Sequence, residues 1–593
     1  MKFDIDWPGL SNPNVLFFDI ETDGLQPEVI HCIVTMDEAG EIKRYNHAEE
    51  GNLNKGLEAL KVADVLVGHN IIAYDLPVLA TLYPGWATNA IVRDTLVLAR
   101  LGYPNVQEED YKKRKLPVKL MGSHSLKAWG HRLDFEKFNY GEEDETAWEQ
   151  WSLEMEDYCQ RDVEVIHRLF MKFCKDIEGC PDIFEKALEL ELTMQDLTES
   201  MTYRGFYFNR KEGEKLYARL LSKKDQLSEE LKELFPPKEI ALKTKVKLVP
   251  FNPGSRNQIA ERFVAKGWEP KEFTPNGRPM INEPVLEGLE ADYPEAKALK
   301  EFLLVQKRIG QLAEGPNSWL GLVTEDNRLH GRVISCGATV SHRMVHFSPN
   351  LGQVPSVGAA YGEECRSLFC VPEGRKLVGT DLSGIELRVL AHFLAFWDKG
   401  EYARQVEEGD IHTSNMKAAG LTDRAQAKTM IYALIYGGGD QRLGEIVGGS
   451  RKDGANLRKR FYDSNPAFLK FIKSVKAKAK KNKKLRGLDG RPLFPRSLHS
   501  APNLLLQSAA AVVAKKATIL HRLLLESRGL RFETDWWFVA MVHDEWQIEC
   551  KENLAEEIAE AAPKAIRDAG EFYELRVKLE GEAKVGDTWL DTH

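Results

Sequence analysis

The sequence predicts a multidomain protein of α/β and α+β architecture, and three observations lead to this prediction. The chain has 593 residues, which is enough for about four domains of ordinary size. Short apolar runs near the N-terminus alternate with turn signals, whereas helical patterns fill the stretch from about 400 to 530. A hairpin pattern follows, with apolar segments at 536–541 and 546–550 around a turn at 543–544.

The first half of the chain alternates between predicted strands and helices. Two apolar runs, Val15–Ile20 and Val62–Val67, are typical of buried strands. Residues 155–174 have helical periodicity, and the turn residues at 179–181 predict a domain boundary. Residues 184–234 predict long charged helices. We expect the lysine-rich segment Pro236–Pro250 to be a short basic loop.

Composition narrows the class of protein. Hydrophobic residues make up 43% of the chain and charged residues 29%, which argues against a disordered, collagen-like or coiled-coil chain. The net charge of −9 disfavours a nucleic-acid coat protein but allows a DNA enzyme with a local basic surface. Eight cysteines without a C-x-x-C pair predict neither a zinc site nor a redox motif. We expect a cytoplasmic protein without a signal peptide or membrane span.

Four carboxylates and a tyrosine form the first candidate site. Asp19 and Glu21 end the first predicted strand at positions i and i+2, so both side chains lie on one face of it. Solvated acids at a strand end are the alternative interpretation. Asp75 follows the second predicted strand, and Tyr158 and Asp162 stand one helical turn apart. The set predicts a site for two divalent cations about 4 Å apart, with Tyr158 orienting an attacking water.

A second candidate site combines two acids that lie far apart in the sequence. Asp381 ends a predicted strand, and a helix is expected to begin near Ser383. Asp544 stands at the tip of the predicted hairpin. Each acid alone has a structural explanation, since Asp is common at strand ends and in tight turns.

A stripe of cations and aromatic rings lies between these two acids. Its residues recur every four positions and would extend about 18 Å along a helix: Arg424, Lys428, Tyr432 and Tyr436. Cations suit a triphosphate and aromatic rings suit a base, although an amphipathic core helix is the alternative. The three glycines at 437–439 predict the end of that helix.

These motifs resemble two known families. Residues 14–175 resemble the RNase H-like, DnaQ-like 3′–5′ exonuclease domain of proofreading polymerases. The remainder resembles the family A DNA polymerases, through D-L-S-G-I-E-L-R at Asp381–Arg388, R-A-Q-A-K-T-M-I-Y-A-L-I-Y-G at Arg424–Gly437 and V-H-D-E at Val542–Glu545. The segments F-N-P-G-S-R and G-L-D-G-R are most similar to replicative polymerases of short-tailed bacteriophages.

The resemblance implies a DNA-templated DNA polymerase that also proofreads. It implies two Mg²⁺ ions in each active site, with Mn²⁺ as a substitute. The implied ligands of the polymerase metals are Asp381, Asp544 and the Leu382 carbonyl. The implied nucleotide-binding residues are Leu382, Glu386, His412, Arg424, Lys428, Tyr432 and Tyr436. Lys428 would protonate the leaving pyrophosphate, and Glu386 would exclude a 2′-OH. The residues that match minor-groove contacts are Arg343, Gln507 and His543.

The resemblance also implies a right-hand polymerase behind the exonuclease. We expect the exonuclease at 1–182, the thumb and connecting helices at 183–317, the fingers at 394–504, and the palm at 318–393 and 505–593. Expected partners are primer-template DNA, dNTPs, and a phage helicase–primase and single-stranded DNA-binding protein. Thioredoxin is not expected, because only Pro236–Pro250 occupies the place of a longer thumb insertion in thioredoxin-using relatives. A phage-encoded enzyme would act in the host cytoplasm.

Three other functions are open at this stage. A pure nuclease with a helical DNA-binding half would not extend a primer, so primer extension by an Asp19→Ala, Glu21→Ala variant would discriminate against it. A non-catalytic clamp or scaffold would not incorporate dNTPs. A single-subunit RNA polymerase shares the polymerase motif residues, but Glu386 and the exonuclease motifs oppose it. The lysine run at 473–486 is either a solvated face or a contact for phosphates.

Overall fold

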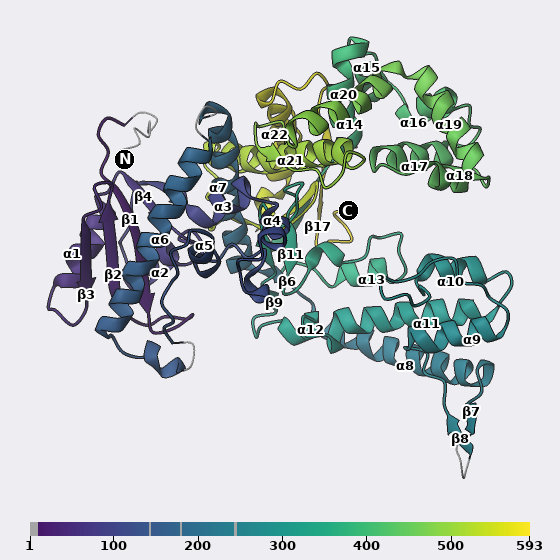
Figure 1. The fold of residues 1–593 in the computed structure, drawn as a ribbon, viewed down its shortest axis with the longest axis horizontal. Coiled ribbons are helices and arrows are strands. Elements are labelled where there is room, and N and C mark those ends of the chain that lie inside the picture. Colours follow the sequence, from purple (N-terminus) through teal and green to yellow (C-terminus); the bar gives the residue numbers. More distant parts are fainter. Residues whose placement is uncertain (1–9, 142–143, 178–180, 242–245) are drawn as a thin grey trace. The chain divides into compact units, whose positions relative to one another are not determined.

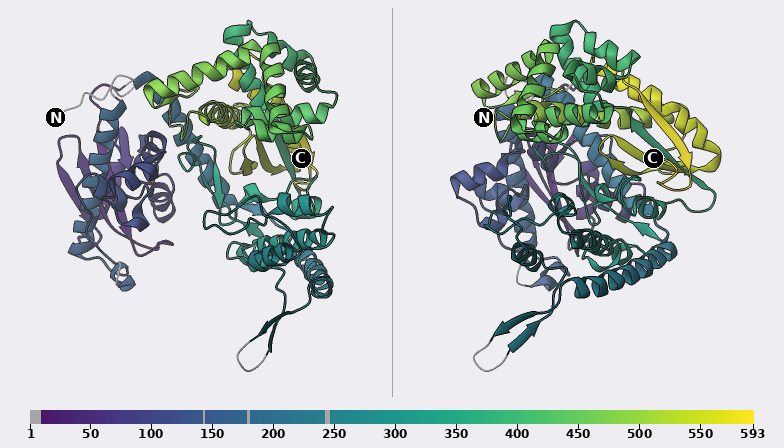
Figure 2. Two further views of the ribbon diagram at one scale, coloured as in Figure 1. Left: turned by 45° about the vertical axis from the view of Figure 1, so that its right-hand side comes forward. Right: turned by 90° about the vertical axis from the view of Figure 1, so that its right-hand side faces the viewer.

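The computed structural model describes residues 10–141, 144–177, 181–241 and 246–593, and the chain divides into two compact units (Figures 1 and 2). Unit 1 comprises Met1–Tyr203, Val333–Val345 and Val378–Val585. Unit 2 comprises Arg204–Arg332, His346–Leu377 and Gly586–His593.

A five-stranded sheet forms the N-terminal part of unit 1, in the order β3-β2-β1-β4-β5. β1 pairs antiparallel with β2 and parallel with β4, so the two strands predicted near the N-terminus are confirmed. The strands are β1 (Val15–Thr22), β2 (Ile30–Asp37), β3 (Ile42–Asn46), β4 (Val65–Gly68) and β5 (Ile91–Asp94). The helices are α1 (Asn52–Lys61), α2 (Asp75–Leu82), α3 (Thr95–Gly102), α4 (Val106–Lys113), α5 (Leu126–Arg132), α6 (Leu153–Ile177) and α7 (Pro181–Arg204).

Alternate residues of β1 pack on opposite faces of this sheet. Phe17 lies in a core with α6, where its ring centroid is 5.6 Å from that of Phe170. Phe18 belongs to a second core, which α1 and α2 cover. Because side chains alternate along a strand, Asp19 and Glu21 lie on the face of Phe17, which α6 covers.

A four-stranded sheet in the order β15-β16-β12-β17 anchors the C-terminal part of unit 1. Its strands are β12 (Arg375–Leu382), β15 (Trp536–Val542), β16 (Glu545–Lys551) and β17 (Gly581–Gly586). β15 and β16 pair antiparallel around residues 543–544, which confirms the predicted hairpin. His543 at its tip has a φ of +61°, a left-handed conformation common in tight turns.

Helices surround this sheet and share one large hydrophobic core with it. The predicted helical region is confirmed, with only short strands interrupting it. The helices are α14 (Ile385–Asp398), α15 (Glu401–Glu408), α16 (Ile411–Ala419), α17 (Arg424–Ile435), α18 (Asp440–Ile446), α19 (Arg451–Ser464), α20 (Pro466–Asn482), α21 (Ala501–Ser527) and α22 (Ala555–Phe572). The short strands are β10 (Arg332–Ile334), β11 (Val345–Phe347), β13 (Leu485–Arg486) and β14 (Pro492–Leu493). Among the described helices, none is both long enough and apolar enough to cross a membrane.

Unit 2 is built on the packed helices α8 and α11 and on an aromatic cluster of Phe206, Phe369 and Trp589. Its helices are α8 (Arg210–Leu234), α9 (Arg256–Ala265), α10 (Glu283–Leu289), α11 (Glu295–Ile309), α12 (Trp319–Leu322) and α13 (Gly362–Ser367). A two-stranded sheet pairs β6 (Phe206–Tyr207) with β9 (Arg328–Leu329).

We predicted an irregular basic loop at Pro236–Pro250, and this prediction was wrong. The described residues form an antiparallel hairpin of β7 (Lys238–Ala241) and β8 (Val246–Val249), which projects from the helices of unit 2 (Figure 2). Valine and leucine alternate with lysine along β8, which is a strand pattern that the lysine content obscured.

Candidate active sites

The first candidate site lies where β1, α2 and α6 meet. β1 supplies Asp19 and Glu21 from the face that α6 covers. α6 supplies Tyr158 and Asp162 one turn apart, and Asp75 begins α2. All five residues line one cavity of about 780 Å³, so the structure brings together the whole set predicted from the sequence.

Burial makes the negative charges of this cluster costly. Burial raises the pKa of Asp19 and Glu21 well above their ordinary values, and the neighbouring carboxylates raise them further. Burial also raises the pKa of Asp75 to about 7 and that of Asp162 to about 6. The site therefore favours any ligand that supplies positive charge.

The unsatisfied oxygens of the site fit a divalent cation. Among the described residues, Oδ1 of Asp75 and Oδ1 of Asp162 are buried and have no hydrogen-bond partner. A buried acceptor without a partner costs free energy unless a ligand satisfies it. Carboxylate oxygens are the ligands that Mg²⁺ and Mn²⁺ prefer. The four acids therefore form a suitable donor set for such an ion.

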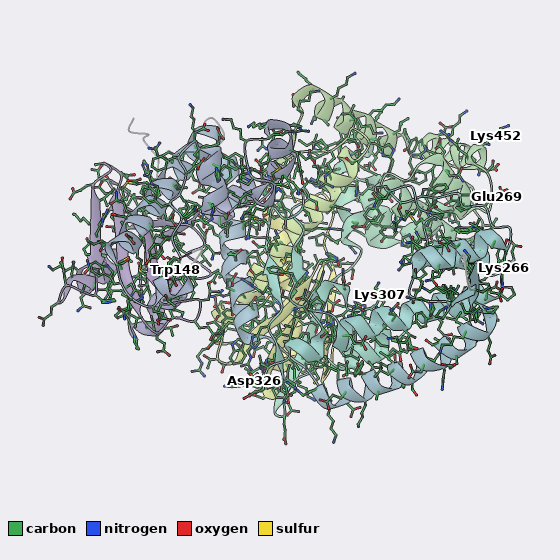
Figure 3. The ribbon with its side chains drawn as sticks, turned by 60° about the horizontal axis from the view of Figure 1, so that its bottom comes forward. Trp148, Lys266, Glu269, Lys307, Asp326 and Lys452 are labelled. Carbon is green, nitrogen blue, oxygen red and sulfur yellow. The ribbon has the colours of Figure 1, made fainter. Side chains whose placement is uncertain are left out.

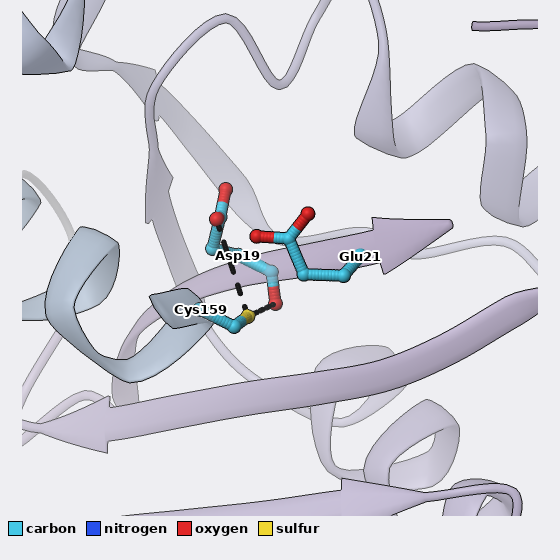
Figure 4. A group of neighbouring side chains, drawn as sticks. All are labelled: Asp19, Glu21 and Cys159. Carbon is cyan, nitrogen blue, oxygen red and sulfur yellow. Dashed lines mark hydrogen bonds between the residues drawn. The ribbon is translucent and has the colours of Figure 1, made fainter. Parts of the chain in front are cut away.

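Cys159 is a close neighbour of the acids that the sequence analysis did not identify. Its Sγ lies in one group with carboxylate oxygens of Asp19 and Glu21, all within 4.8 Å of one another (Figure 4). The thiol contacts the backbone oxygen of Asp19 at 3.5 Å and its Oδ2 at 4.0 Å. Burial raises the pKa of Cys159 well above its ordinary value, so the group remains a thiol that donates to Asp19.

Lys137 is a second residue of this site that the sequence did not predict. Its Nζ donates to the hydroxyl of Tyr158 at 2.9 Å and pairs with Oδ2 of Asp162. The lysine comes from the segment between α5 and α6, where no periodic pattern draws attention to it. Asp162 and Tyr158 raise the pKa of Lys137 despite its burial, so this lysine gives the site a fixed positive charge.

Trp148 packs against the ring of Tyr158. The ring of Trp148, labelled in Figure 3, lies edge to face with that of Tyr158 at a centroid distance of 5.9 Å. Both rings line the same cavity as the acids. Aromatic faces beside a metal-binding cluster suit the bases of a single-stranded nucleic acid.

The second candidate site lies where β12 ends beside the tip of the β15–β16 hairpin. Asp381 is the next-to-last residue of β12, and the following amide, that of Leu382, donates to the carbonyl of Asp544 at 3.1 Å. This hydrogen bond places the two predicted acids at adjoining strand ends. Burial raises the pKa of the Asp544 carboxyl, while the neighbouring His543 acts in the opposite direction.

These strand ends offer hard oxygen donors to a cation. Asp381 is exposed and Asp544 is half-buried, and Leu382, which follows Asp381, is hydrogen-bonded through its amide to the Asp544 carbonyl. Two carboxylates and a carbonyl are oxygen ligands of the kind that Mg²⁺ binds together with substrate phosphates. These donor types are the ones that the predicted cations would require.

Helix α17 carries three of the four residues of the predicted stripe. Arg424 and Lys428 are exposed and Tyr432 is half-buried. Arg424 donates from Nε and Nη2 to the carboxylate of Asp410 at 2.6 and 3.0 Å. Lys428 has no ion-pair partner among the described residues. Tyr436 lies one residue past the end of the helix, so the helical stripe is a turn shorter than predicted.

His412 on α16 joins the cationic end of this stripe. Its ring centroid is 6.2 Å from that of Tyr432. Burial lowers the pKa of His412, and the charges of Arg424 and Lys428 lower it further. Its Nδ1 is buried without a partner among the described residues. A neutral histidine beside two cations makes a group of donors for an anionic ligand.

Glu386 near the start of α14 is held in place from two sides. It accepts hydrogen bonds from Nη2 of Arg343 at 2.7 Å and from the hydroxyl of Tyr436 at 2.5 Å. Burial and Glu386 together raise the pKa of Tyr436 to about 12. Arg343 also lines a small cavity with His543 and Asp544, which places it at the second site.

Gln507 is the remaining residue of the predicted minor-groove contacts. Gln507 is half-buried on α21. Other residues of α21, Ala510 and Ala511, line the small cavity beside Asp544, but Gln507 is not part of that lining. Its assignment as a DNA contact stays a prediction.

Comparison with known proteins relates the chain to one family. The sequence profile described as DNA polymerase family A matches residues 219–591. The chain is 34% identical to the DNA-directed DNA polymerase of Enterobacteria phage T3, over 98% of this chain and 100% of that protein. It is also 34% identical to the DNA-directed DNA polymerase of Escherichia phage T7, over 97% of this chain and 99% of that protein.

A solved structure has the same fold. The POL domain of Pol1 from M. smegmatis, in complex with a DNA primer-template and dNTP, superposes with a TM-score of 0.78. The match covers 97% of this chain and 96% of that chain at 18% sequence identity, so it is a likeness of fold. The alignment with the phage T3 protein runs over 707 positions, more than the 593 residues present here, so that relative has segments that this chain lacks.

Proposed function

This chain belongs to DNA polymerase family A and is a DNA-directed DNA polymerase that acts in replication, and we propose how its two sites divide the work. The second site would extend a primer 3′-OH with dNTPs. The first site would remove nucleotides from the 3′ end. The observation that carries the proposal is the Leu382–Asp544 hydrogen bond, which brings two distant acids together.

The polymerase site would hold its cations between two strand ends. Asp381, Asp544 and the carbonyl of Leu382 are the proposed ligands of Mg²⁺, with Mn²⁺ as a substitute. When bound, the ions lower the pKa of the primer 3′-OH and neutralise the triphosphate. The β12 strand and the hairpin fix the ligands on rigid elements, so little reorganisation is needed when substrate arrives.

The cationic end of α17 would bind the triphosphate of the incoming dNTP. Arg424 would exchange its contact with Asp410 for a phosphate, because a guanidinium binds either anion with two parallel hydrogen bonds. Lys428 is available without breaking an ion pair among the described residues. It would also donate a proton to the leaving pyrophosphate, and His412 would donate a hydrogen bond to the same group.

The residues around Glu386 would select the sugar and check the base pair. Arg343 and Tyr436 fix the Glu386 carboxylate, which would leave no space for a 2′-OH. Arg343, His543 and Gln507 would contact minor-groove acceptors, which every Watson–Crick pair presents. Such contacts test pairing without reading sequence.

The first site would be a 3′–5′ exonuclease. Its four acids would hold two divalent cations, and Tyr158 would orient the attacking water. The cavity beside them is lined by aromatic rings that suit an unpaired 3′ end. The buried, partnerless carboxylate oxygens support this assignment.

We also propose domain limits and partners for the polymerase, as the sequence predicted them. The exonuclease would occupy 1–182, the thumb 183–317, the fingers 394–504, and the palm 318–393 and 505–593. The substrates would be primer-template DNA and dNTPs, and a helicase–primase and a single-stranded DNA-binding protein of the same phage would act with it in the host cytoplasm. The β7–β8 hairpin is too small for a thioredoxin-docking domain, so added thioredoxin should leave product length unchanged.

A primer-extension time course tests the central assignment. Purified protein with Mg²⁺ and all four dNTPs should extend a labelled primer to the end of its template. With dNTPs omitted, the same protein should shorten the primer from its 3′ end. Incorporation of rNTPs at rates equal to dNTPs would contradict the assignment as a DNA polymerase.

A further inference from the structure

One basic surface of unit 1 has no role in the two active sites. We define the α20 lysine face as six of the seven exposed lysines on and just after helix α20: Lys470, Lys473, Lys480, Lys481, Lys483 and Lys484. No aspartate or glutamate occurs from residue 464 to residue 488. The chain as a whole has a net charge of −9, so this is a local concentration of positive charge.

The opposite side of α20 fixes this surface to the hydrophobic core. Phe468, Phe471, Val475 and Ala479 are at most 5% exposed. Phe471 stacks on Phe393 of α14 with 5.7 Å between ring centroids. At 100° per residue, the buried residues occupy one side of the helix and the lysines the other. The lysines therefore stand on a rigid support rather than on a mobile loop.

The lysines are not neutralised within the protein. Over the described part of the chain, none of the six forms an ion pair, whereas lysines on other surface helices do, such as Lys215 with Glu212. The helix dipole accounts for Lys480 and Lys481 in the last turn. It does not account for Lys470 and Lys473, which stand in the N-terminal half.

The exposed side chains of the α20 lysine face suit a polyanionic ligand. Apart from lysines, the exposed residues at 470–486 are Ala477, Asn482 and Arg486, so no large apolar side chain is exposed there. A protein partner that docks through an apolar anchor would find no place for it. Lysine attracts phosphates as a point charge and without base specificity.

The shape of the face favours a flexible strand over a duplex. One side of α20 packs into the hydrophobic core, so only its convex lysine side is open to a ligand. A stiff duplex on a convex helix touches few phosphates, whereas a single strand bends along it. The distance from Lys470 to Lys481 is about 16 Å along the axis, which is the length of a few nucleotides.

From these observations we infer that the α20 lysine face binds the phosphate backbone of the single-stranded template outside the polymerase site. This inference rests on the polymerase function of the chain. It adds a second, sequence-independent contact for DNA, which would slow dissociation from templates with long single-stranded regions.

Salt-dependent binding tests this inference. Binding of the full-length Lys473→Gln, Lys480→Gln double variant is compared with wild type, on primer-templates with a long or a short single-stranded 5′ template overhang. Each lost phosphate contact to a single strand should reduce the magnitude of the slope of log K against log salt by about 0.7. On the long overhang, the slope of the double variant should therefore be smaller in magnitude than that of wild type by about 1.4. On the short overhang the slopes should agree, and extension of a short template at low salt should match wild type.

A matched control removes the same charge elsewhere. Lys55→Gln with Lys61→Gln on α1 neutralises two exposed lysines and should leave both slopes unchanged. Equal slopes for the α20 variant and wild type on the long overhang would overturn the inference. So would an equal reduction on both substrates, which would assign the face to duplex DNA. An unchanged slope together with lost binding of a polyaspartate peptide would assign it to an acidic protein.

Discussion

The ammonium group of Lys137 donates a hydrogen bond of 2.9 Å to the hydroxyl of Tyr158 and stands 4.4 Å from the centroid of that ring. The same nitrogen pairs with Asp162 on the next turn of α6. Lys137 thus fixes the phenol through both its hydroxyl and its ring face. It also brings a positive charge into a site of four acids.

Replacing Lys137 by methionine should reduce 3′–5′ degradation while primer extension stays at the wild-type rate. The change keeps the length of the side chain but releases Tyr158 and Asp162 from a charged hydrogen bond, which is worth about 1.5–3 kcal/mol. That loss corresponds to about a tenfold to hundredfold lower rate. Single-turnover degradation of a labelled single strand measures it.

The control for this variant is Lys115→Met, which removes an exposed lysine paired with Asp134. It should degrade DNA at the wild-type rate. Lys137→Arg should recover part of the activity, because a guanidinium can reach both partners. Full activity of Lys137→Met would contradict a positioning role for the lysine.

The two acid clusters predict separable activities. Asp381→Ala or Asp544→Ala should abolish primer extension and leave 3′–5′ degradation, because each change removes a proposed metal ligand from the second site alone. Asp19→Ala with Glu21→Ala should do the reverse. Gel assays of both reactions, with circular dichroism to confirm folding, measure the outcome. A folded variant that loses both activities would contradict the assignment of two independent sites.

The sequence predicted the acid clusters because local patterns carry them. The i, i+2 spacing of Asp19 and Glu21 on β1 and the hairpin tip at Asp544 follow from strand periodicity and turn chemistry, and the structure confirms both elements. Lys137 was beyond such reasoning, because it reaches Tyr158 from an irregular segment. Cys159 was not predicted either, because a single cysteine in a helical pattern does not indicate a contact with Asp19.

Buried ion pairs between segments far apart in the sequence could not be predicted from local patterns either. Lys515 on α21 donates to both carboxylate oxygens of Glu191 on α7, 324 positions away, at 2.7 and 2.8 Å. Arg491 pairs with the same carboxylate at 2.6 Å. Nothing local in the sequence indicates that α7 and α21 meet, so the helical pattern from about 400 to 530 gave no sign of this buried charge.

Glu386 offers a prediction about sugar selection. Glu386→Ala should raise incorporation of ribonucleotides relative to deoxyribonucleotides, by roughly tenfold or more, because it opens space at the 2′ position. Glu386→Gln keeps the volume and should keep most of the discrimination. Competition between rNTP and dNTP, in the Asp19→Ala, Glu21→Ala background, measures the ratio. Unchanged discrimination in Glu386→Ala would show that the side chain does not lie beneath the sugar.

His521 on α21 links folding stability to pH. Its Nδ1 accepts a hydrogen bond from the indole of Trp546 at 3.1 Å, and its Nε2 donates to the carbonyl of Ile558 at 3.0 Å. This pattern requires a neutral ring, because a proton on Nδ1 would face the indole N–H. Burial lowers the pKa of His521 to about 4.

Stability should therefore fall as pH drops from about 6.5 toward 4, because the unfolded histidine, with a pKa of about 6.5, binds the proton that the folded one excludes. The contribution of His521 is present above pH 6.5 and amounts at most to roughly 3 kcal/mol. His521→Gln should show a shallower decline of its urea midpoint over this range. His499→Gln, at an exposed position, should decline as steeply as wild type. Parallel declines of wild type and His521→Gln would refute the linkage.

Tyr432 gives the last prediction, which concerns the 3′ position of the incoming sugar. Its ring lies half-buried on α17, two turns beyond Arg424 and beside His412. Burial raises the pKa of Tyr432, with Glu386 and Asp544 contributing, so its hydroxyl stays protonated and able to donate. A hydroxyl near the ribose would replace the hydrogen bond that a dideoxynucleotide lacks. Wild type should therefore terminate readily with ddNTPs.

Tyr432→Phe removes only that hydroxyl and keeps the ring against His412. Since a net hydrogen bond is worth about 1 kcal/mol, the variant should discriminate against ddNTPs about fivefold more strongly than wild type, and by more if the bond is charge-assisted. Competition between ddNTP and dNTP in the exonuclease-deficient background measures this ratio. Tyr402→Phe provides the matched control, because that hydroxyl is buried and hydrogen-bonded to Asn415. Equal ddNTP discrimination by wild type and Tyr432→Phe would mean that the hydroxyl does not face the sugar, and that α17 presents a different side to the nucleotide.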